Sequence, residues 1–247
     1  MRVLFAHPAY PGQFGLLGRW LHARLGWDVS FLCSDRRGMD APFRVYRYDP
    51  GPLDRIRGAP KAFSDDDHHG LAAARTLRGM LEAGEAPERL VFHSGFGVGR
   101  YFGEVTDIPR IGLFEWYFDP HAMRAPARPE TAPTPGARLT VHGTNAGLLL
   151  DLVNADAAWT SAANQRAQFP ALLQPKLQVF PDAYDAALFH PAAESSRTVG
   201  SLELPTDRPI VSFTSRGLER RRGFDTFLQV AWRVQQRRPD VCFVVLG

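Results

Sequence analysis

Polar side chains that could bind a substrate or transfer a proton stand at the ends of three apolar runs. His7, His93 and Glu115 each come directly after such a run. Imidazole and carboxylate groups are common proton donors and acceptors in enzyme sites. Because ligands of open α/β sheets bind beyond the carboxyl ends of the strands, these three positions are the first candidates for a functional site.

A glycine-rich turn follows each of the two histidines. The glycines are Gly12, Gly15 and Gly18 in the first turn and Gly95, Gly97 and Gly99 in the second. The first turn leads into a predicted helix, and a helix N-terminus favours anions. Its spacing differs from the dinucleotide fingerprint, so a tight turn without a ligand is an equal alternative. The second turn would let a substrate approach the backbone closely beside His93, with a purely structural histidine as the alternative.

Arginines dominate the segment 212–224, which follows an apolar run and opens a predicted helix. Arg216 lies just past the run, and Arg222 lies just before the glycine at which the helix starts. Guanidinium groups bind oxyanions at two points, and a helix N-terminus adds favourable backbone N–H groups. We expect both arginines to bind a diphosphate, with a solvated basic turn as the alternative.

The run 65–69 holds three aspartates and two histidines, a combination that also occurs in metal sites. Carboxylates at the start of a helix stabilise it through capping and the helix dipole, and we favour this interpretation. Adjacent histidines point away from each other on a helix. Cys33 and Cys242 are far apart and lack metal-ligand spacing. We therefore expect no metal and no cofactor, and the free thiols suit a reducing, cytoplasmic setting.

The composition is that of a globular protein. Apolar residues make up 45% of the 247 residues and charged residues 22%. The 29 Lys and Arg against 26 Asp and Glu leave a net charge of +3, too small an excess to indicate nucleic acid as a partner. The apolar runs are shorter than a membrane span, and the N-terminal run is too short for a signal peptide.

Apolar runs alternate with helical patterns along residues 1–190. The expected strands are 3–6, 29–33, 43–48, 89–92, 110–114, 157–160 and 177–180, and the expected helices are 15–25, 65–81, 137–153 and 162–169. On the first helix, one face carries the large apolar residues Leu16, Leu17, Trp20, Leu21 and Leu25. The alternation predicts an α/β fold, a doubly wound parallel sheet of the Rossmann-like kind.

Three segments depart from this pattern. Residues 120–136 carry five prolines and predict a long irregular loop. Residues 191–208 are polar and predict a linker. From 209 the strand–helix–strand pattern restarts, and it stops at Gly247. One such unit cannot bury a two-sided sheet, so we expect 209–247 to be the start of an incomplete second Rossmann-like domain.

Taken together, the motifs resemble those of the bacterial glycosyltransferases of family 4, which have the GT-B fold. The matching residues are His7-Pro8, Pro11–Phe14, His93 with its glycines, Glu115–Phe118, Arg138 with Asn145-Ala146, Phe169-Pro170, Phe180–Asp182, Phe189 with Pro191, Arg216–Glu219, Arg222–Phe224 and Val244–Gly247. The resemblance runs through nearly the whole chain, and the block that begins at Arg216 is its most specific part.

The resemblance implies two facing Rossmann-like domains, of which the first binds an acceptor and the second a nucleotide-sugar donor. It implies transfer that retains the anomeric configuration and uses no metal. Arg216 and Arg222 would hold the donor diphosphate, although the family more often has Lys where Arg222 stands. The acidic pair with which the family grips the donor's sugar and ribose lies beyond Gly247.

Roles for the first domain also follow from the resemblance. His93 would be the catalytic residue that reaches the transferred sugar. Gly12 would let the first turn approach donor or acceptor, and Gln13, Gly15 and Glu115 would bind substrate with it.

The predicted function is therefore transfer of a hexose from a nucleotide sugar to a glycan, lipid-linked or small-molecule acceptor. The expected protein is cytoplasmic, its peripheral association with a membrane is left open, and the truncated form is expected to be inactive. One alternative is another GT-B enzyme, such as a nucleotide-sugar epimerase, which acts on a donor without an acceptor. The other is a non-catalytic remnant or binding module, which the incomplete second domain favours.

Overall fold

The computed structural model describes residues 1–38, 40–51, 61–119, 135–187, 189–191 and 197–247. The chain divides into two compact units, Met1–Asp185 and Ala186–Gly247. The loop predicted for 120–136 lies almost wholly outside the described residues. The first unit has the α/β fold that the alternating pattern predicts.

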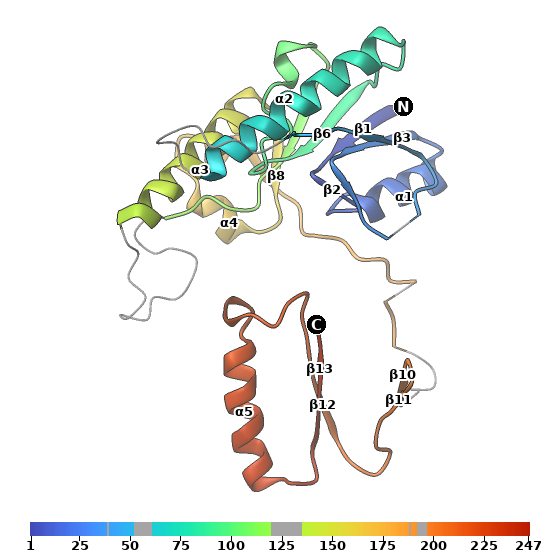
Figure 1. Cartoon of the computed structure of the whole chain (residues 1–247), viewed down its shortest axis with the longest axis vertical. Helices are drawn as coiled ribbons and strands as arrows, with labels where there is room; N and C mark the ends of the chain where they lie inside the picture. The colour runs from blue at the N-terminus through green and yellow to red at the C-terminus, as the bar shows by residue number, and fades with distance from the viewer. Residues whose placement is uncertain (39, 52–60, 120–134, 188, 192–196) are drawn as a thin grey trace. The chain divides into compact units, whose positions relative to one another are not determined.

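Among the described residues, seven parallel strands form the sheet of the first unit (Figure 1). In spatial order they are β5 (Arg44–Arg47), β3 (Asp28–Cys33), β1 (Arg2–Ala6), β6 (Arg89–His93), β7 (Arg110–Leu113), β8 (Ala157–Thr160) and β9 (Leu177–Val179). The chain adds β3 and β5 on one side of β1, and then β6 to β9 on the other. The strand order reverses between β1 and β6, and doubly wound sheets bind ligands in the crevice at such a point.

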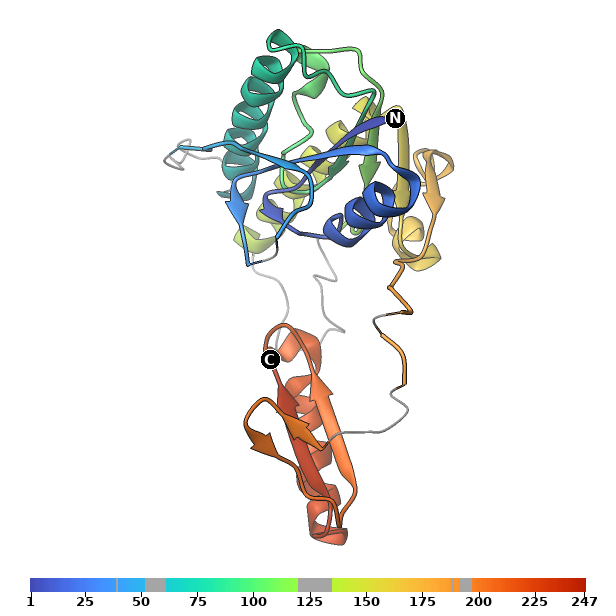
Figure 2. The ribbon, with the colours of Figure 1, turned by 90° about the vertical axis from the view of Figure 1, so that its right-hand side faces the viewer.

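Helices cover both faces of this sheet because successive side chains of each strand point to opposite faces. On β1, Leu4 packs into one apolar cluster and Phe5 into the other. Residues of α2 (Lys61–Glu82) and α3 (Pro135–Asn154) complete the cluster of Leu4. The cluster of Phe5 includes a residue of α1 (Gly15–Leu25), so α1 lies on the opposite face (Figures 1 and 2).

The apolar face predicted for α1 is not the face that packs on the sheet. Leu21 is buried, but the other four members of that face are between 43% and 52% exposed: Leu16, Leu17, Trp20 and Leu25. The helix instead buries Gly15 and Gly18. A Cβ on Gly18 would lie 3.3 Å from Phe43 Cζ, so the helix approaches the sheet through its small residues. The pattern of apolar residues does not identify this packing face, because glycine contributes no apolar side chain to it.

Short elements join these layers. They are β2 (Ala9–Tyr10), β4 (Asp35–Arg36), the 3₁₀ turns η1 (Phe102–Glu104) and η3 (Gln174–Lys176), and helix α4 (Ala163–Gln168). β2 and β4 pair in parallel beyond the ends of β1 and β3. The loops that follow these two strands are therefore fixed to each other at the carboxyl edge of the sheet.

The three aspartates of the run 65–69 do not start a helix, which corrects the expectation above. Helix α2 begins at Lys61, so Asp65 and its two successors lie in the second turn. Asp66 and Asp67 instead form ion pairs with Arg100, which is buried. Their charges are used in a tertiary contact and not in capping.

The second unit holds the strand–helix–strand pattern predicted for 209–247. Its elements are β12 (Ile210–Thr214), the turn η4 (Arg220–Arg222), α5 (Phe224–Arg237) and β13 (Cys242–Leu246), with β12 and β13 parallel. Phe213, Phe227 and Phe243 pack between the helix and the strands. The segment predicted as a linker contains a short antiparallel hairpin of β10 (Thr198–Val199) and β11 (Leu202–Glu203).

Candidate functional site

The reversal of strand order brings the three predicted polar residues together. Strand β1 pairs with β6, and β6 pairs with β7, so the residues after these strands meet at one edge. His93 Nε2 lies 3.5 Å from Glu115 Oε2. The imidazole rings of His7 and His93 lie with their centroids 5.2 Å apart. The prediction that His7, His93 and Glu115 share the carboxyl edge of the sheet is confirmed.

The first glycine-rich turn contributes Gln13 to the same cluster. Gln13 Nε2 donates a hydrogen bond of 3.3 Å to Glu115 Oε1, so both carboxylate oxygens of Glu115 have a partner. Gly12 has a φ of +47°, and a Cβ there would lie 2.6 Å from His7 Nδ1. Only glycine allows the turn to fold this closely over the imidazole. The turn thereby holds His7 and presents Gln13.

Gly15 packs within the first turn, and its predicted part in substrate binding stays a prediction. Its backbone N–H donates to Pro11 O at 2.7 Å, and a Cβ there would lie 2.2 Å from Pro11 Cβ. The residue is buried at the start of α1. Gly15 therefore shapes the turn, and the exposed part of the turn is formed by Gly12 and Gln13.

The cluster has an outer pair, Gln13 and Glu115, and an inner pair, His7 and His93, which differ in their exposure to solvent. The Glu115 side chain is 30% exposed and Gln13 is exposed. The His93 side chain is 2% exposed, and its Nδ1 has no hydrogen-bond partner within the part of the chain that the structure describes. A substrate that enters this edge of the sheet meets the amide and the carboxylate first, with the histidines behind them.

Burial and mutual contacts set the charges of this cluster. The hydrogen bond from His93 holds the pKa of Glu115 below its usual range, and Gln13 acts in the same direction. Burial, followed by the neighbouring His93, lowers the pKa of His7 from 6.5 to about 4. At neutral pH Glu115 is therefore ionised and His7 is uncharged. The outer pair offers hydrogen-bond acceptors on Glu115 and an amide on Gln13, a combination that suits sugar hydroxyl groups.

Aromatic rings frame the two histidines. Phe96, from the turn after β6, lies edge-on to both imidazoles, with centroids 5.3 Å from His7 and 5.0 Å from His93. Phe14 lies behind them with its centroid 6.2 Å from that of His93, and it is fully buried. These rings lower the local polarity, which explains why burial dominates the pKa of His7.

Three residues that the sequence analysis did not select support the turn after β6: Ser94, Arg100 and Asp151. Ser94 Oγ donates a hydrogen bond of 2.8 Å to Asp151 Oδ2, and Arg100 lies between Asp151 and α2. Asp151 had a detectable signal, because it interrupts the apolar run 148–153 of a predicted helix. A charged residue in a buried apolar face needs a partner. Asp151 therefore predicts either a buried, paired carboxylate or a helix face that does not pack in the core.

The predicted diphosphate-binding arginines belong to the second unit. Arg216 and Arg222 are exposed, and Gly223, with a φ of +80°, starts α5 directly after Arg222. Arg220 has its own partner, since its Nε lies 3.2 Å from Asp225 Oδ2 in the first turn of α5. Arg216 thus precedes η4 and Arg222 ends it, next to the N-terminal end of α5, and their binding of a diphosphate stays a prediction.

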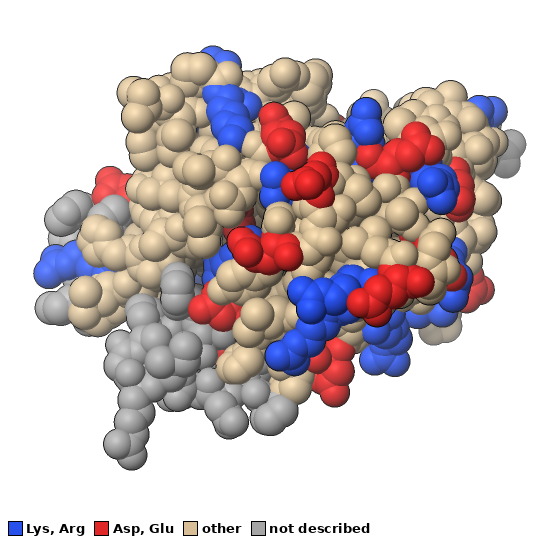
Figure 3. Space-filling view, turned by 90° about the horizontal axis from the view of Figure 1, so that it is seen from above, with Lys and Arg blue, Asp and Glu red and all other residues tan. Residues whose placement is uncertain are grey.

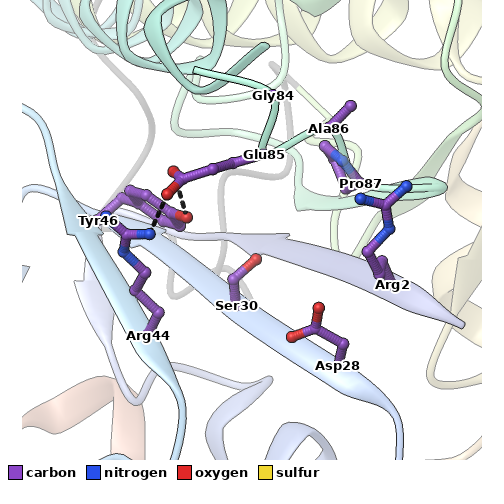
Figure 4. A pocket seen from close by; sticks show the side chains of 9 residues that line it. All are labelled: Arg2, Asp28, Ser30, Arg44, Tyr46, Gly84, Glu85, Ala86 and Pro87. Carbon is purple, nitrogen blue, oxygen red and sulfur yellow. Dashed lines mark hydrogen bonds and ion pairs between the residues drawn. The ribbon is translucent and has the colours of Figure 1, made fainter.

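A polar depression of about 300 Å³ lies at the opposite end of the strands (Figure 4). Arg2, Asp28 and Arg44 line it from the first residues of β1, β3 and β5. Glu85 binds both Arg44 and Tyr46, whose hydroxyl donates to Glu85 Oε2 at 2.8 Å. Two of its charges, Arg44 and Glu85, are thus paired with each other within the depression.

On the face shown in Figure 3, acidic and basic side chains are interspersed. Across the described ranges, three or more His, Cys, Asp or Glu residues nowhere gather in a way that could hold a metal ion. None of the helices in these ranges is long and apolar enough to cross a membrane.

Comparison with known proteins gives a family and a fold. The profile of the glycosyl transferase family 4 group matches residues 25–189, about two thirds of the chain. None of the curated protein sequences compared with the chain matches it.

Solved structures with the same fold are glycosyltransferases of the GT-B type. Sucrose-phosphate synthase from Thermosynechococcus elongatus matches with a TM-score of 0.68 and 18% identity over 99% of this chain and 62% of that one. The glycotransferase of kitacinnamycin matches with 0.55 and 15% over 99% and 65%. Os79 from O. sativa, solved with UDP and deoxynivalenol-3-glucoside, matches with 0.52 and 13% over 98% and 71%. The chain thus spans less than two thirds of the length of the first of these proteins.

Proposed function

The chain belongs to the glycosyl transferase family 4 group, and we propose that it transfers a hexose from a nucleotide sugar to a hydroxyl group of an acceptor, with retention of the anomeric configuration. Family membership supports the reaction class. The structures with UDP or with a glycoside in the same fold support a nucleotide-sugar donor. Two parts of the proposal rest on the resemblance of the motifs to family 4: that the anomeric configuration is retained, and that the transferred sugar is a hexose. The acceptor is a glycan, a lipid-linked sugar or a small molecule.

One observation carries the assignment of the first unit to the acceptor. The outer pair at the reversal of strand order is an ionised carboxylate, Glu115, with the amide of Gln13 beside it. A carboxylate repels a diphosphate but accepts hydrogen bonds from sugar hydroxyls, and such charge-assisted bonds are strong. The edge formed by β1, β6 and β7 is therefore suited to a polyhydroxylated, uncharged part of a substrate.

His93 acts in this proposal through Glu115. Its side chain is 2% exposed and its Nε2 faces the Glu115 carboxylate, so we assign it a role behind Glu115 in place of the direct contact with the transferred sugar that the resemblance implies. We assign Glu115 and Gln13 to substrate contact and His93 to holding Glu115. Gly12 allows the turn that presents Gln13, since no other residue fits over His7 at that φ.

The donor diphosphate binds to the second unit in this proposal. Arg216 and Arg222 lie near the N-terminal end of α5, where backbone N–H groups point outward. Charge-assisted contacts there would stabilise the charge that develops on the leaving diphosphate. The proposal needs no metal, because the arginines and the helix N-terminus supply the positive charge.

Product analysis tests this function. A version of the protein with a complete second domain is incubated with UDP-, ADP- and GDP-hexoses, each with a panel of free sugars, simple alcohols and polyprenyl-linked sugars, and products are read by mass spectrometry. Transfer to an acceptor, with the anomeric coupling of the donor preserved in the NMR spectrum of the product, is the expected outcome. Conversion of a nucleotide sugar without any acceptor would indicate an epimerase instead. Inverted product would overturn retention alone.

A further inference from the structure

Arg100 is a buried arginine at the end of the glycine-rich turn after β6. Its guanidinium faces three carboxylates: Nη1 lies 2.7 Å from Asp67 Oδ1, Nη2 3.4 Å from Asp66 Oδ2 and Nε 3.7 Å from Asp151 Oδ1. Arg100 is 3% exposed and Asp151 is 1% exposed. Two of the aspartates belong to α2 and the third to α3, so the cluster ties the turn to both helices of that face.

Asp151 connects this cluster to the candidate site. Its Oδ2 accepts a hydrogen bond of 2.8 Å from Ser94 Oγ, and the backbone N–H of Gly95 also donates to its carboxylate. Ser94 directly follows His93 in the chain. The backbone N–H of Ser94 donates to Leu113 O of β7 at 2.9 Å. Ser94 is therefore held on two sides, by the buried cluster and by the strand that leads to Glu115.

The packing around the cluster leaves no room for a side chain at two of its glycines. Gly97 has a φ of +71°, and a Cβ there would lie 1.8 Å from the carbonyl oxygen of Asp66. A Cβ on Gly147 of α3 would lie 2.2 Å from Arg100 Nη2. The turn and both helices thus contact the guanidinium and its partners directly.

The cluster is costly, which indicates that it serves more than packing. Burial raises the pKa of Asp66 from 3.8 to about 7, and burial raises the pKa of Asp151 as well. Three carboxylates share one guanidinium, and apolar side chains of similar volume often stabilise a protein core more than a buried ion cluster does. What a hydrogen-bonded ion cluster provides is a defined geometry, because each contact has a direction.

We propose that Arg100 and Asp151 are positioning residues that act through Ser94, and that they hold the turn after β6 in the conformation in which the His93 imidazole meets Glu115. The consequence for catalysis rests on the proposed function, in which Glu115 contacts the substrate. The positioning itself is a property of the folded chain and is measured without any substrate.

Long-range ¹H–¹⁵N NMR of the histidine rings tests the positioning in the 247-residue chain. Ser94→Ala removes the hydroxyl link, and Asp151→Asn keeps an acceptor for Ser94 but removes the charge that faces Arg100. Asp156→Asn is the matched control, because Asp156 also pairs with an arginine, at 3.4 Å, but at the surface. We expect both test variants to shift the His93 ring resonances. The control should leave them unchanged.

The groups that face His93 define how its ring signals are interpreted. They are His7 from the end of β1, Glu115 from the end of β7, and the rings of Phe14 and Phe96. None of them is altered in the variants, so a changed His93 signal reports a changed ring position. The fraction of folded protein is checked by circular dichroism, and Ser94→Ala is the milder variant if Asp151→Asn does not fold.

A folded Ser94→Ala with reduced thermal stability and an unchanged His93 spectrum would overturn the proposal, because the cluster would then be structural only. Failure of the proposed function gives a different result. In that case the His93 signal moves in the variants while no donor and acceptor yield a product. Loss of transfer in Glu115→Gln together with an unmoved His93 signal in both cluster variants would refute the positioning alone.

Discussion

His93 Nε2 and Glu115 Oε2 lie 3.5 Å apart, each at the end of one of two adjacent parallel strands. The two residues are 22 positions apart in the chain, and the register of β6 with β7 brings them to the same edge. Glu115 is the more exposed of the two, so the proposed function assigns substrate contact to the carboxylate and a supporting role to the histidine.

The first prediction concerns Glu115. Glu115→Gln removes the charge but keeps the shape, and it should lower hexose transfer about 10- to 150-fold, the loss expected for a charge-assisted hydrogen bond of about 1.5–3 kcal/mol. The thermal unfolding midpoint should change little, because the side chain is partly exposed. Turnover and unfolding are measured on the same preparations. Glu104→Gln, at an exposed glutamate of η1, is the control and should transfer normally.

The second prediction concerns the pH dependence that His7 confers. Its pKa is about 4 in the folded chain against 6.5 in the unfolded one, so the unfolded state binds more protons between these values. Its contribution to stability is therefore complete above about pH 6.5 and is lost as pH falls towards 4, by at most about 1.4 kcal/mol per pH unit. The charged and polar groups that face the ring are left unaltered in the variant below; they are His93, Gln13 and Glu115. His7→Gln should flatten the curve of unfolding free energy against pH over this window, as measured by urea denaturation.

Asp66 should produce a slope of the opposite sign. Burial raises its pKa from 3.8 to about 7, so the folded state binds more protons between these values. Stability then decreases as pH rises from about 4 to 7. Arg100, Asp67 and Asp151 face the carboxyl group and reduce this effect or add to it. In Asp66→Asn the decrease should disappear, whereas Asp156→Asn, at a surface ion pair, should keep the parent curve. An unchanged slope in Asp66→Asn would contradict the assignment.

Much of the fold follows from local patterns in the sequence. The alternation of apolar runs and helical patterns predicts the strands β1, β3, β6, β7 and β8 and their parallel pairing. The edge position of His93 and Glu115 follows from the same patterns, because polar residues directly after buried strands lie at the carboxyl edge. Helix α1 is predicted with its observed ends, since Gly26, at a φ of +63°, stops it.

The features that the sequence did not predict depend on long-range contacts. The packing face of α1 is set by Gly18 against Phe43, not by the leucines. Asp66 and Asp67 pair with Arg100, more than 30 positions away in the chain. The neighbouring residues alone give no sign of this partner, so they favour helix capping. The hairpin in the predicted linker has only two residues in each strand, too few for a period-two pattern.

A pair of glycine substitutions separates steric contact from backbone strain in the turn after β6. Gly97 and Gly84 have nearly the same φ, +71° and +76°, but a methyl group on Gly97 would lie 1.8 Å from its nearest neighbour, whereas one on Gly84 would meet no atom within 4 Å. Gly84→Ala should cost about 1–2 kcal/mol through φ alone. Gly97→Ala should cost about 2–6 kcal/mol, because strain and overpacking add. Equal losses in urea denaturation would mean that the turn moves freely away from α2.

The last prediction concerns the arginines of the second unit. Arg216→Ala and Arg222→Ala should each weaken binding of UDP about 10- to 150-fold, as expected for a lost charge-assisted phosphate contact of about 1.5–3 kcal/mol. Both side chains are exposed, so thermal unfolding should change little. Isothermal titration calorimetry with UDP and with uridine separates the affinity contributed by the diphosphate from that contributed by the nucleoside. The two variants should differ from the parent in their affinity for UDP and not in their affinity for uridine.

Arg220→Ala is the matched control for this turn. It removes the same charge from the same segment, but Arg220 already pairs with Asp225, at 3.2 Å. Loss of an exposed ion pair costs about 0–1 kcal/mol of stability, and UDP binding should stay within about threefold of the parent. If all three variants weaken UDP binding equally, the segment acts as a general electrostatic surface. In that case the assignment of the diphosphate to Arg216 and Arg222 is wrong.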